Sequence, residues 1–229
     1  STLMIAIPAL ILSSLLALVL GTIMGYRKNT KLDNGITTGF IVLDAVPTFL
    51  LAMMLVTVFS FQLDIFPLGG LTSTNVSSNG FFSFWDRVWH LILPILTVTL
   101  VSTPNKYLLV RNSVAAAKEE KYVIYAKARG LSTNRIRFIH IFKNVCQSFI
   151  AMVGLNLGFL ISGSMITEVI FSIHGMGSLI YDAAVFRDYP TLQGCFFFIA
   201  LLVILGNILT DVICILVDPR QRFGVNNET

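Results

Sequence analysis

The chain has 229 residues, of which 55% are apolar and only 12% charged, and its mean hydropathy is +0.80. These values exclude an ordinary soluble domain and predict an integral membrane protein. The net charge of +4 does not indicate nucleic-acid binding, because the basic residues are not interleaved with exposed aromatic residues on one soluble face.

Apolar stretches long enough to cross a hydrocarbon core of about 30 Å recur along the chain. They cover residues 3–26, 40–63, 91–111, 146–170 and 194–217. The first stretch begins almost at residue 1 without a Met or a basic leader, so we expect a fragment rather than a signal peptide or a native start. Residues 1–229 are predicted to form a single all-α transmembrane domain, a polytopic bundle with five spans.

Basic residues are concentrated in alternate loops. The loops at 27–39 and 112–145 and the C-terminal tail contain most of them, and we assign Lys106 and Arg111 to a helix end beside these loops. The positive-inside rule therefore predicts an outer N-terminus, a cytoplasmic C-terminus and a cytoplasmic 112–145 loop. The opposite loop, 64–90, is expected to be extracytoplasmic.

The outer loop, 64–90, begins with many Gly, Ser, Thr and Asn residues and then becomes aromatic. The aromatic residues are Phe81, Phe82, Phe84, Trp85 and Trp89. Aromatic residues of this kind form belts at membrane interfaces. They could equally dock an external substrate-binding protein, and both interpretations stay open.

The most informative segment is the inner stretch 118–144, which is basic and is interrupted by one glycine. Helix-forming residues continue to Arg129, Gly130 can end a helix in a left-handed turn, and Ser132 can cap the start of a second helix. This pattern predicts a helix-turn-helix elbow that binds a partner in the cytoplasm.

The elbow resembles the cytoplasmic "EAA" loop of ABC-importer permeases, in the version found in peptide and nickel importers. That version has an Ala-Lys-Gly-Leu-Ser element followed by a His and an Asn. The matching positions here are Ala128, Arg129, Gly130, Leu131, Ser132, His140 and Asn144. Two further strings, TEVIFSIHGMG at 167–177 and the terminal Asp218-Pro219-Arg220, also resemble motifs of the oligopeptide, dipeptide and nickel permease family.

The resemblance implies a type I ABC-importer permease whose first family helix is missing. It implies a complex with a second permease, two ABC ATPase subunits and an extracytoplasmic substrate-binding protein, and an elbow, including Tyr122 and Ala126, that inserts into the ATPase. The chain contains no GxxxxGK[ST] motif, so ATP and Mg are expected on the partner subunits and no enzymatic activity on this chain. The alternative is an ion-coupled carrier or channel that needs no ATPase.

Carboxylates inside predicted spans are a second class of candidate site, because each costs roughly 2.5–3.5 kcal/mol at mid-bilayer. Asp44, Glu168 and Asp211 are the candidates for a translocation path or a subunit interface. For Glu168 and Asp211 we favour structural roles, Glu168 pairing with a polar group and Asp211 anchoring a helix end.

Other chemistry is poorly supported. His90, His140 and His174 lie in separate segments without the spacing of zinc ligands, and the three cysteines are expected to be packing residues. Ser164 and His174 lack the GxSxG-type nucleophile motif of a hydrolase.

Small residues between 146 and 170, at Gly154, Gly158 and Gly163, predict close helix packing, either within the chain or between subunits. Nothing in the sequence selects among peptide, nickel, metallophore or glutathione cargo.

Overall fold

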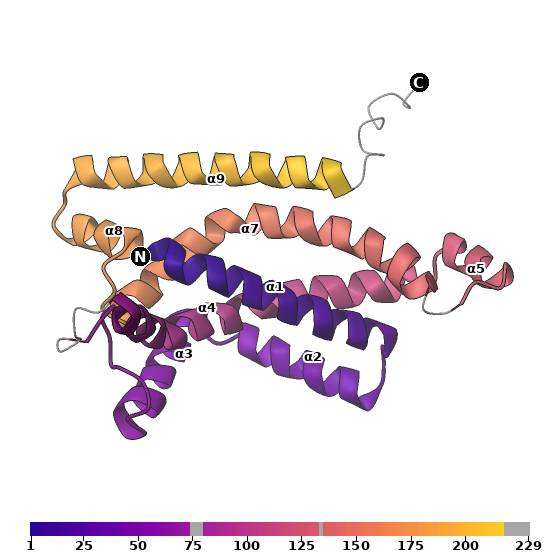
Figure 1. Ribbon diagram of the computed structural model, residues 1–229, viewed down its shortest axis with the longest axis horizontal. Coiled ribbons are helices and arrows are strands. Elements are labelled where there is room, and N and C mark those ends of the chain that lie inside the picture. The colour runs from indigo at the N-terminus through magenta and orange to yellow at the C-terminus, as the bar shows by residue number, and fades with distance from the viewer. Residues whose placement is uncertain (74–79, 133–134, 218–229) are drawn as a thin grey trace.

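The computed structural model describes residues 1–73, 80–132 and 135–217, and every regular element in those ranges is a helix. The elements are α1 (Thr2–Tyr26), α2 (Lys31–Asp44), α3 (Thr48–Leu55), the π-helical η1 (Val56–Gln62), α4 (Gly80–Ala117), α5 (Lys121–Ala128), the π-helical η2 (Ile136–Ile141), α7 (Phe142–Ile170), α8 (Met176–Val185) and α9 (Tyr189–Val217). The long helices run along one direction, with α5 at one end and α8 and the N-terminus at the other (Figure 1). The predicted all-α bundle is confirmed.

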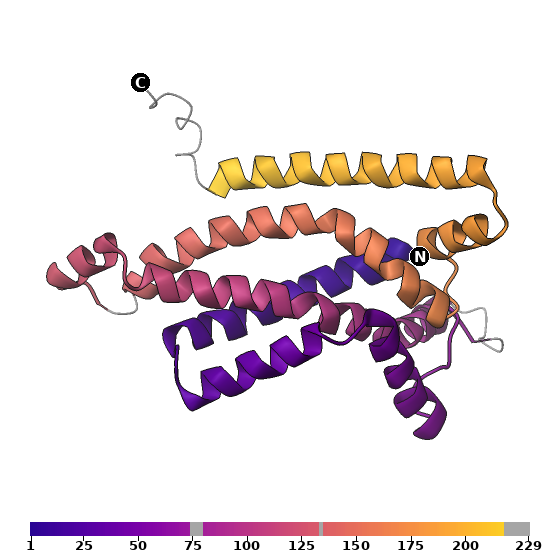
Figure 2. The same cartoon turned by 180° about the vertical axis from the view of Figure 1, so that it is seen from behind.

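Helices α1 and α4 lie against each other, as both views show (Figures 1 and 2). Small residues occupy every fourth position of the buried face of α1, namely Ala9, Ser13, Ala17, Gly21 and Gly25. A Cβ atom on Gly21 would lie 2.8 Å from the Cβ of Val110, and one on Gly25 would lie 2.7 Å from the carbonyl oxygen of Arg111. Such close approach is typical of membrane helices. The sequence analysis placed this kind of packing only in 146–170 and missed α1.

The second predicted span, 40–63, is not one helix. Helix α2 begins at Lys31, where the Thr30 side chain accepts a hydrogen bond from the Asp33 backbone N–H, and it ends at Asp44. Pro47 follows, and a proline disfavours helical geometry in the residue before it. The chain therefore turns by 99° before α3 and η1.

By length and hydropathy, α1, α4 and α9 can each cross a membrane, and the bent pair of α2 with α3 and η1 would make a fourth span. The predicted stretch 146–170 lies within α7. Helix α4 extends beyond its predicted limits, so 80–90 of the expected outer loop and 112–117 of the expected inner loop are helical. The five aromatic residues of the outer loop lie exposed on the first turns of α4.

Helices α7 and α9 touch through Gly154, since a Cβ atom there would collide with Thr210. The predicted packing role is thus seen within the chain at this position, whereas the surroundings of Gly158 and Gly163 lie outside the described residues. Asp188 caps α9 by accepting hydrogen bonds from the backbone N–H of Thr191 at 3.2 Å and from its hydroxyl at 2.6 Å. Helix α9 consequently begins at Tyr189, earlier than residue 194.

The core has two clusters, one at each end of the bundle. The cluster at the α5 end joins residues of α1, α4, α5, η2 and α7, among them Tyr107, Val114, Val123, Ile141 and Phe149. Because α5 and η2 contribute to the same core as the long helices, the elbow is packed onto the bundle rather than tethered by a loose loop.

Candidate functional site

The elbow has the turn that its glycine predicts. Gly130 has a φ of +75°, its N–H donates to the Lys127 carbonyl, and the next N–H, of Leu131, donates to the Ala126 carbonyl at 3.2 Å. This pair of bonds is the Schellman arrangement that ends a helix at a glycine. The predicted positive φ of Gly130 is confirmed.

Helix α5 presents two different faces. Val123 and Ala126 point into the core, and Ala126 is only 6% exposed. Ile124 and Tyr125 point away from the core, with exposed fractions of 56% and 68%, and Ala128 is exposed beside them. We call Ile124, Tyr125 and Ala128 the elbow face. Large apolar groups exposed on a short polar segment indicate a contact surface.

The remaining predicted elbow residues divide between these faces. Arg129 and Ser132 are exposed, Leu131 is half-buried, and Tyr122 is half-buried with a hydroxyl that has no hydrogen-bond partner in the described part of the chain. The Ser132 carbonyl accepts the Ile136 N–H at 3.1 Å, as expected for a residue where a helix begins. The backbones of His140 and Asn144 belong to η2 and α7, and their side chains lie outside the described residues.

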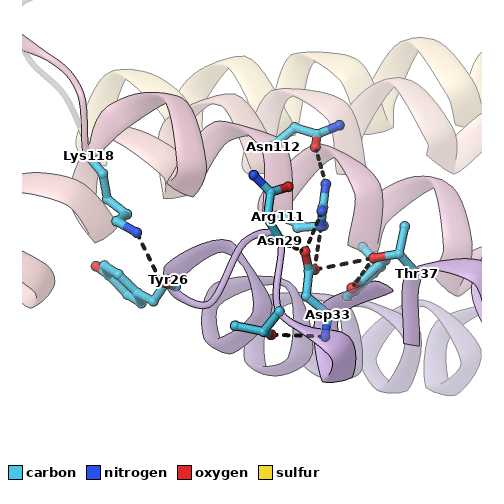
Figure 3. Close-up of polar contacts among 9 residues, drawn as sticks. Tyr26, Asn29, Asp33, Thr37, Arg111, Asn112 and Lys118 are labelled. Atoms are coloured by element: carbon cyan, nitrogen blue, oxygen red, sulfur yellow. Dashed lines mark hydrogen bonds and ion pairs between the residues drawn. The ribbon is translucent and has the colours of Figure 1, made fainter. Parts of the chain in front are cut away.

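A bidentate ion pair lies between α4 and the start of α2 (Figure 3). Arg111 donates from Nε to Oδ1 of Asp33 at 2.6 Å and from Nη2 to Oδ2 at 2.5 Å. Asp33 also accepts from the Asn29 N–H and from the Thr37 hydroxyl, which is in turn 2.9 Å from the Tyr107 hydroxyl. Asp33 is 0% exposed, and these donors compensate its loss of water.

The sequence analysis missed Asp33 and treated Arg111 only as one of several basic residues near the cytoplasm. The available signal was local: Asp33 stands three residues after Thr30, a helix-capping pattern that places its carboxylate at a helix start. Its partner is 78 positions away, so no spacing rule connects the two.

Lys106 does not lie at a helix end as expected, because α4 continues for about three more turns to Ala117. Its side chain is buried, and its Nζ donates to the hydroxyl of Ser13 at 2.7 Å. Ser13 belongs to the middle of α1, so this ammonium group lies deep in the bundle.

Glu168 is fully buried near the end of α7. Its Oε2 accepts the backbone N–H of Ser178 at 3.0 Å, and the Ser164 hydroxyl donates to Oε1 at 3.3 Å. Ser178 lies in the first turn of α8, where unpaired N–H groups and the helix dipole favour a carboxylate. Gly175 and Gly177 provide the space, since a Cβ atom on either would approach Oε2 within 3.0 Å. The geometry favours a structural role for Glu168.

The other two carboxylates are exposed. Asp44 ends α2, about 20 Å along the helix from Lys31, and accepts a hydrogen bond from Nδ2 of Asn105 at 3.1 Å. Asp211 lies in the last third of α9. Within the ranges described, no three His, Cys, Asp or Glu side chains are grouped as metal ligands.

Residues 17–223 match the family described as the binding-protein-dependent transport system inner membrane component. The chain is 33% identical to the oligopeptide transport system permease protein AppB of Bacillus subtilis, over 97% of this chain and 69% of that protein. It is 29% identical to the dipeptide transport system permease protein DppB of Escherichia coli, over 97% and 70%. It is 34% identical to the peptidoglycan transport system permease protein YejB of Agrobacterium fabrum, over 93% of this chain and 60% of that protein.

The fold is similar to a chain in inward-facing structures of the MetNI methionine ABC transporter, with a TM-score of 0.67, 14% sequence identity and coverage of 94% of this chain and 92% of that one. At this identity the likeness concerns the fold. The family match and the sequence relatives favour an importer permease over the ion-coupled carrier or channel that the sequence left as the alternative. The chain belongs to the family of inner membrane components of binding-protein-dependent transport systems.

Proposed function

We propose that this chain forms half of a translocation path for peptides, or for peptide-like or metal-chelate cargo, together with a second permease subunit. An extracytoplasmic binding protein delivers the cargo, and two ABC ATPase subunits bind ATP and Mg and supply the energy. The names of the relatives, which include oligopeptide, dipeptide and peptidoglycan permeases, support peptide-like cargo.

The elbow face is the observation that carries the coupling role. Ile124 and Tyr125 are exposed on a helix that is itself anchored in the core through Val123 and Ala126. A partner that binds the exposed face therefore moves the bundle, because the buried face transmits the displacement to α4 and α7. In this arrangement the elbow, with Arg129, Gly130 and Ser132, docks on the ATPase.

Matched substitutions of two tyrosines test this role. Tyr125→Glu places a charge on the elbow face, and Tyr181→Glu places the same charge on an exposed position of α8, at the opposite end of the bundle. ATPase subunits should be lost from the purified complex in the first variant and retained in the second. Equal retention of the ATPase subunits in both variants would show that the elbow face is not part of the coupling site.

The two alanines of α5 separate docking from folding. Ala128→Glu changes an exposed residue, so the subunit should accumulate normally while cargo-stimulated ATP hydrolysis falls. Ala126→Glu instead buries a carboxylate in the core, so the elbow itself should be destabilised and the amount of inserted subunit should fall.

Asp44 is the best supported candidate for the path or the subunit interface. Its carboxylate is exposed at the end of α2, about 20 Å along the helix from Lys31. In a membrane such a group has to face protein or water rather than lipid. Asp44→Asn should reduce transport without detaching the ATPase if Asp44 faces cargo, whereas loss of the second permease from the complex would indicate a subunit contact. For Asp211, in the last third of α9, we propose that it anchors the cytoplasmic end of the helix.

A further inference from the structure

A cavity of about 310 Å³ lies between the elbow and the end of α1. Its walls combine an apolar part with a cationic part. The lining residues are Tyr26, Lys118, Val123, Lys127, Leu131, Ile136, Arg137 and Ile141. Neither the coupling role of the elbow face nor the carboxylate sites use this cavity.

Among the residues that the structure describes, the three charged residues that line the cavity are cations, and no acidic side chain lines it. Lys118 is held in place because its Nζ donates to the Tyr26 carbonyl at 2.9 Å (Figure 3). The Arg137 guanidinium lies over the Tyr26 ring, 4.9 Å from the ring centroid. Among the described residues, the Lys127 ammonium group has no hydrogen-bond or ion-pair partner. Like charges gathered without an acid favour an anionic ligand.

The position of the cavity limits the kind of anion. Tyr26 is the last residue of α1 and Lys118 directly follows α4, so the cavity lies where two candidate spans end. Tyr, Lys and Arg collect at this depth, beside the lipid headgroups. The apolar side chains of Val123, Ile136 and Ile141 provide a surface that a small hydrated anion does not need.

We propose that this cavity binds the phosphate group of an anionic phospholipid from the cytoplasmic leaflet. Lys118, Lys127 and Arg137 contact the phosphate, and the glycerol and upper acyl carbons lie against the apolar side chains. Basic pockets at cytoplasmic helix ends are suited to such headgroups. The proposal rests on the proposed cytoplasmic orientation of the elbow. The bound lipid bridges the end of α1 and the elbow.

Lipid retention by the complete transporter complex tests the proposal. The complex is equilibrated in detergent with equal parts of phosphatidylglycerol and phosphatidylcholine, and the retained lipids are quantified by mass spectrometry. The native complex should be enriched in phosphatidylglycerol. Lys127→Gln with Arg137→Gln should lower this enrichment about thirtyfold, as expected when two cations at a headgroup are lost.

The control removes the same charge from the same end of the molecule. Lys28→Gln with Lys121→Gln changes two exposed lysines that do not line the cavity, and the enrichment should stay at the native level. Because the Lys127 side chain has no partner to lose in the described part of the chain, Lys127→Gln alone leaves the fold intact and should still lower the enrichment severalfold.

Three results would overturn the proposal. Equal phosphatidylglycerol enrichment in the cavity variants and the control would show that the cavity is not the site. Displacement of the lipid by millimolar inorganic phosphate would indicate a site for a free anion. Loss of the ATPase with unchanged lipid retention would indicate an acidic side chain of the ATPase as the occupant. ATPase attachment is measured separately, so failure of the coupling role and failure of the lipid site are distinguishable.

Discussion

Arg111 and Asp33 form a buried, two-point ion pair that ties the start of α2 to α4 (Figure 3). The guanidinium matches both carboxylate oxygens, a geometry that lysine cannot reproduce. The short α1–α2 connection is therefore fixed to the helix that leads into α5.

Removing one member of this pair should be more damaging than removing both. Arg111→Ala leaves the Asp33 carboxylate buried without its cation, a change that costs about 3 kcal/mol or more. The double variant Arg111→Leu with Asp33→Leu should recover part of this loss. Thermal unfolding of the purified subunit measures the effect. A double variant whose loss equals the sum of the losses of Arg111→Leu and Asp33→Leu, each measured singly, would show that the groups do not interact.

Gly130 should respond to backbone preference rather than to side-chain size. Its φ of +75° disfavours side chains, while a Cβ atom there would meet no other atom within 4 Å. Gly130→Val should therefore weaken the elbow by at least about 1–2 kcal/mol, and Gly130→Asn by less, since asparagine tolerates this conformation. Cargo-stimulated ATP hydrolysis should fall in the same order. Equal activity of the two variants would contradict the role of the left-handed turn.

Substitutions of Glu168 should follow hydrogen-bond capacity. Glu168→Gln keeps an oxygen that can accept the Ser178 N–H, so assembly should be largely retained. Glu168→Leu leaves that buried N–H unpaired, at a cost of about 1–3 kcal/mol. Pull-down of the complex and a transport assay distinguish the roles: a Gln variant that assembles fully but no longer transports would favour contact with cargo over the structural role.

Thiol labelling tests the orientation. Cysteines replacing Thr72 and Ser132, in a chain without the three native cysteines, lie in exposed connections at opposite ends of the bundle. An impermeant reagent applied outside intact cells should label position 72 and spare position 132. The opposite pattern would reverse the topology and place the elbow outside the cytoplasm.

The sequence predicted the features that depend on local chemistry. Gly130 predicts the end of α5, because few other residues adopt its backbone conformation. The apolar stretches predict the helical bundle. It did not reveal which face of α5 is buried, because an eight-residue helix with Val123, Ile124 and Tyr125 in succession has no clear apolar side. The Asp33–Arg111 pair was also inaccessible, since it depends on how α2 folds back along α4. Pro47 indicates a break in the helix, but the length of the apolar stretch 40–63 led to the prediction of a single span.

The Lys106–Ser13 contact has a consequence for biogenesis. Helix α1 precedes α4 in the chain, so Ser13 enters the membrane before Lys106 is made. When α4 then leaves the insertion machinery, its ammonium group can avoid lipid only by docking onto the small-residue face of α1. Pairing of α1 with α4 thus shields the Lys106 ammonium group from lipid while the subunit is being inserted.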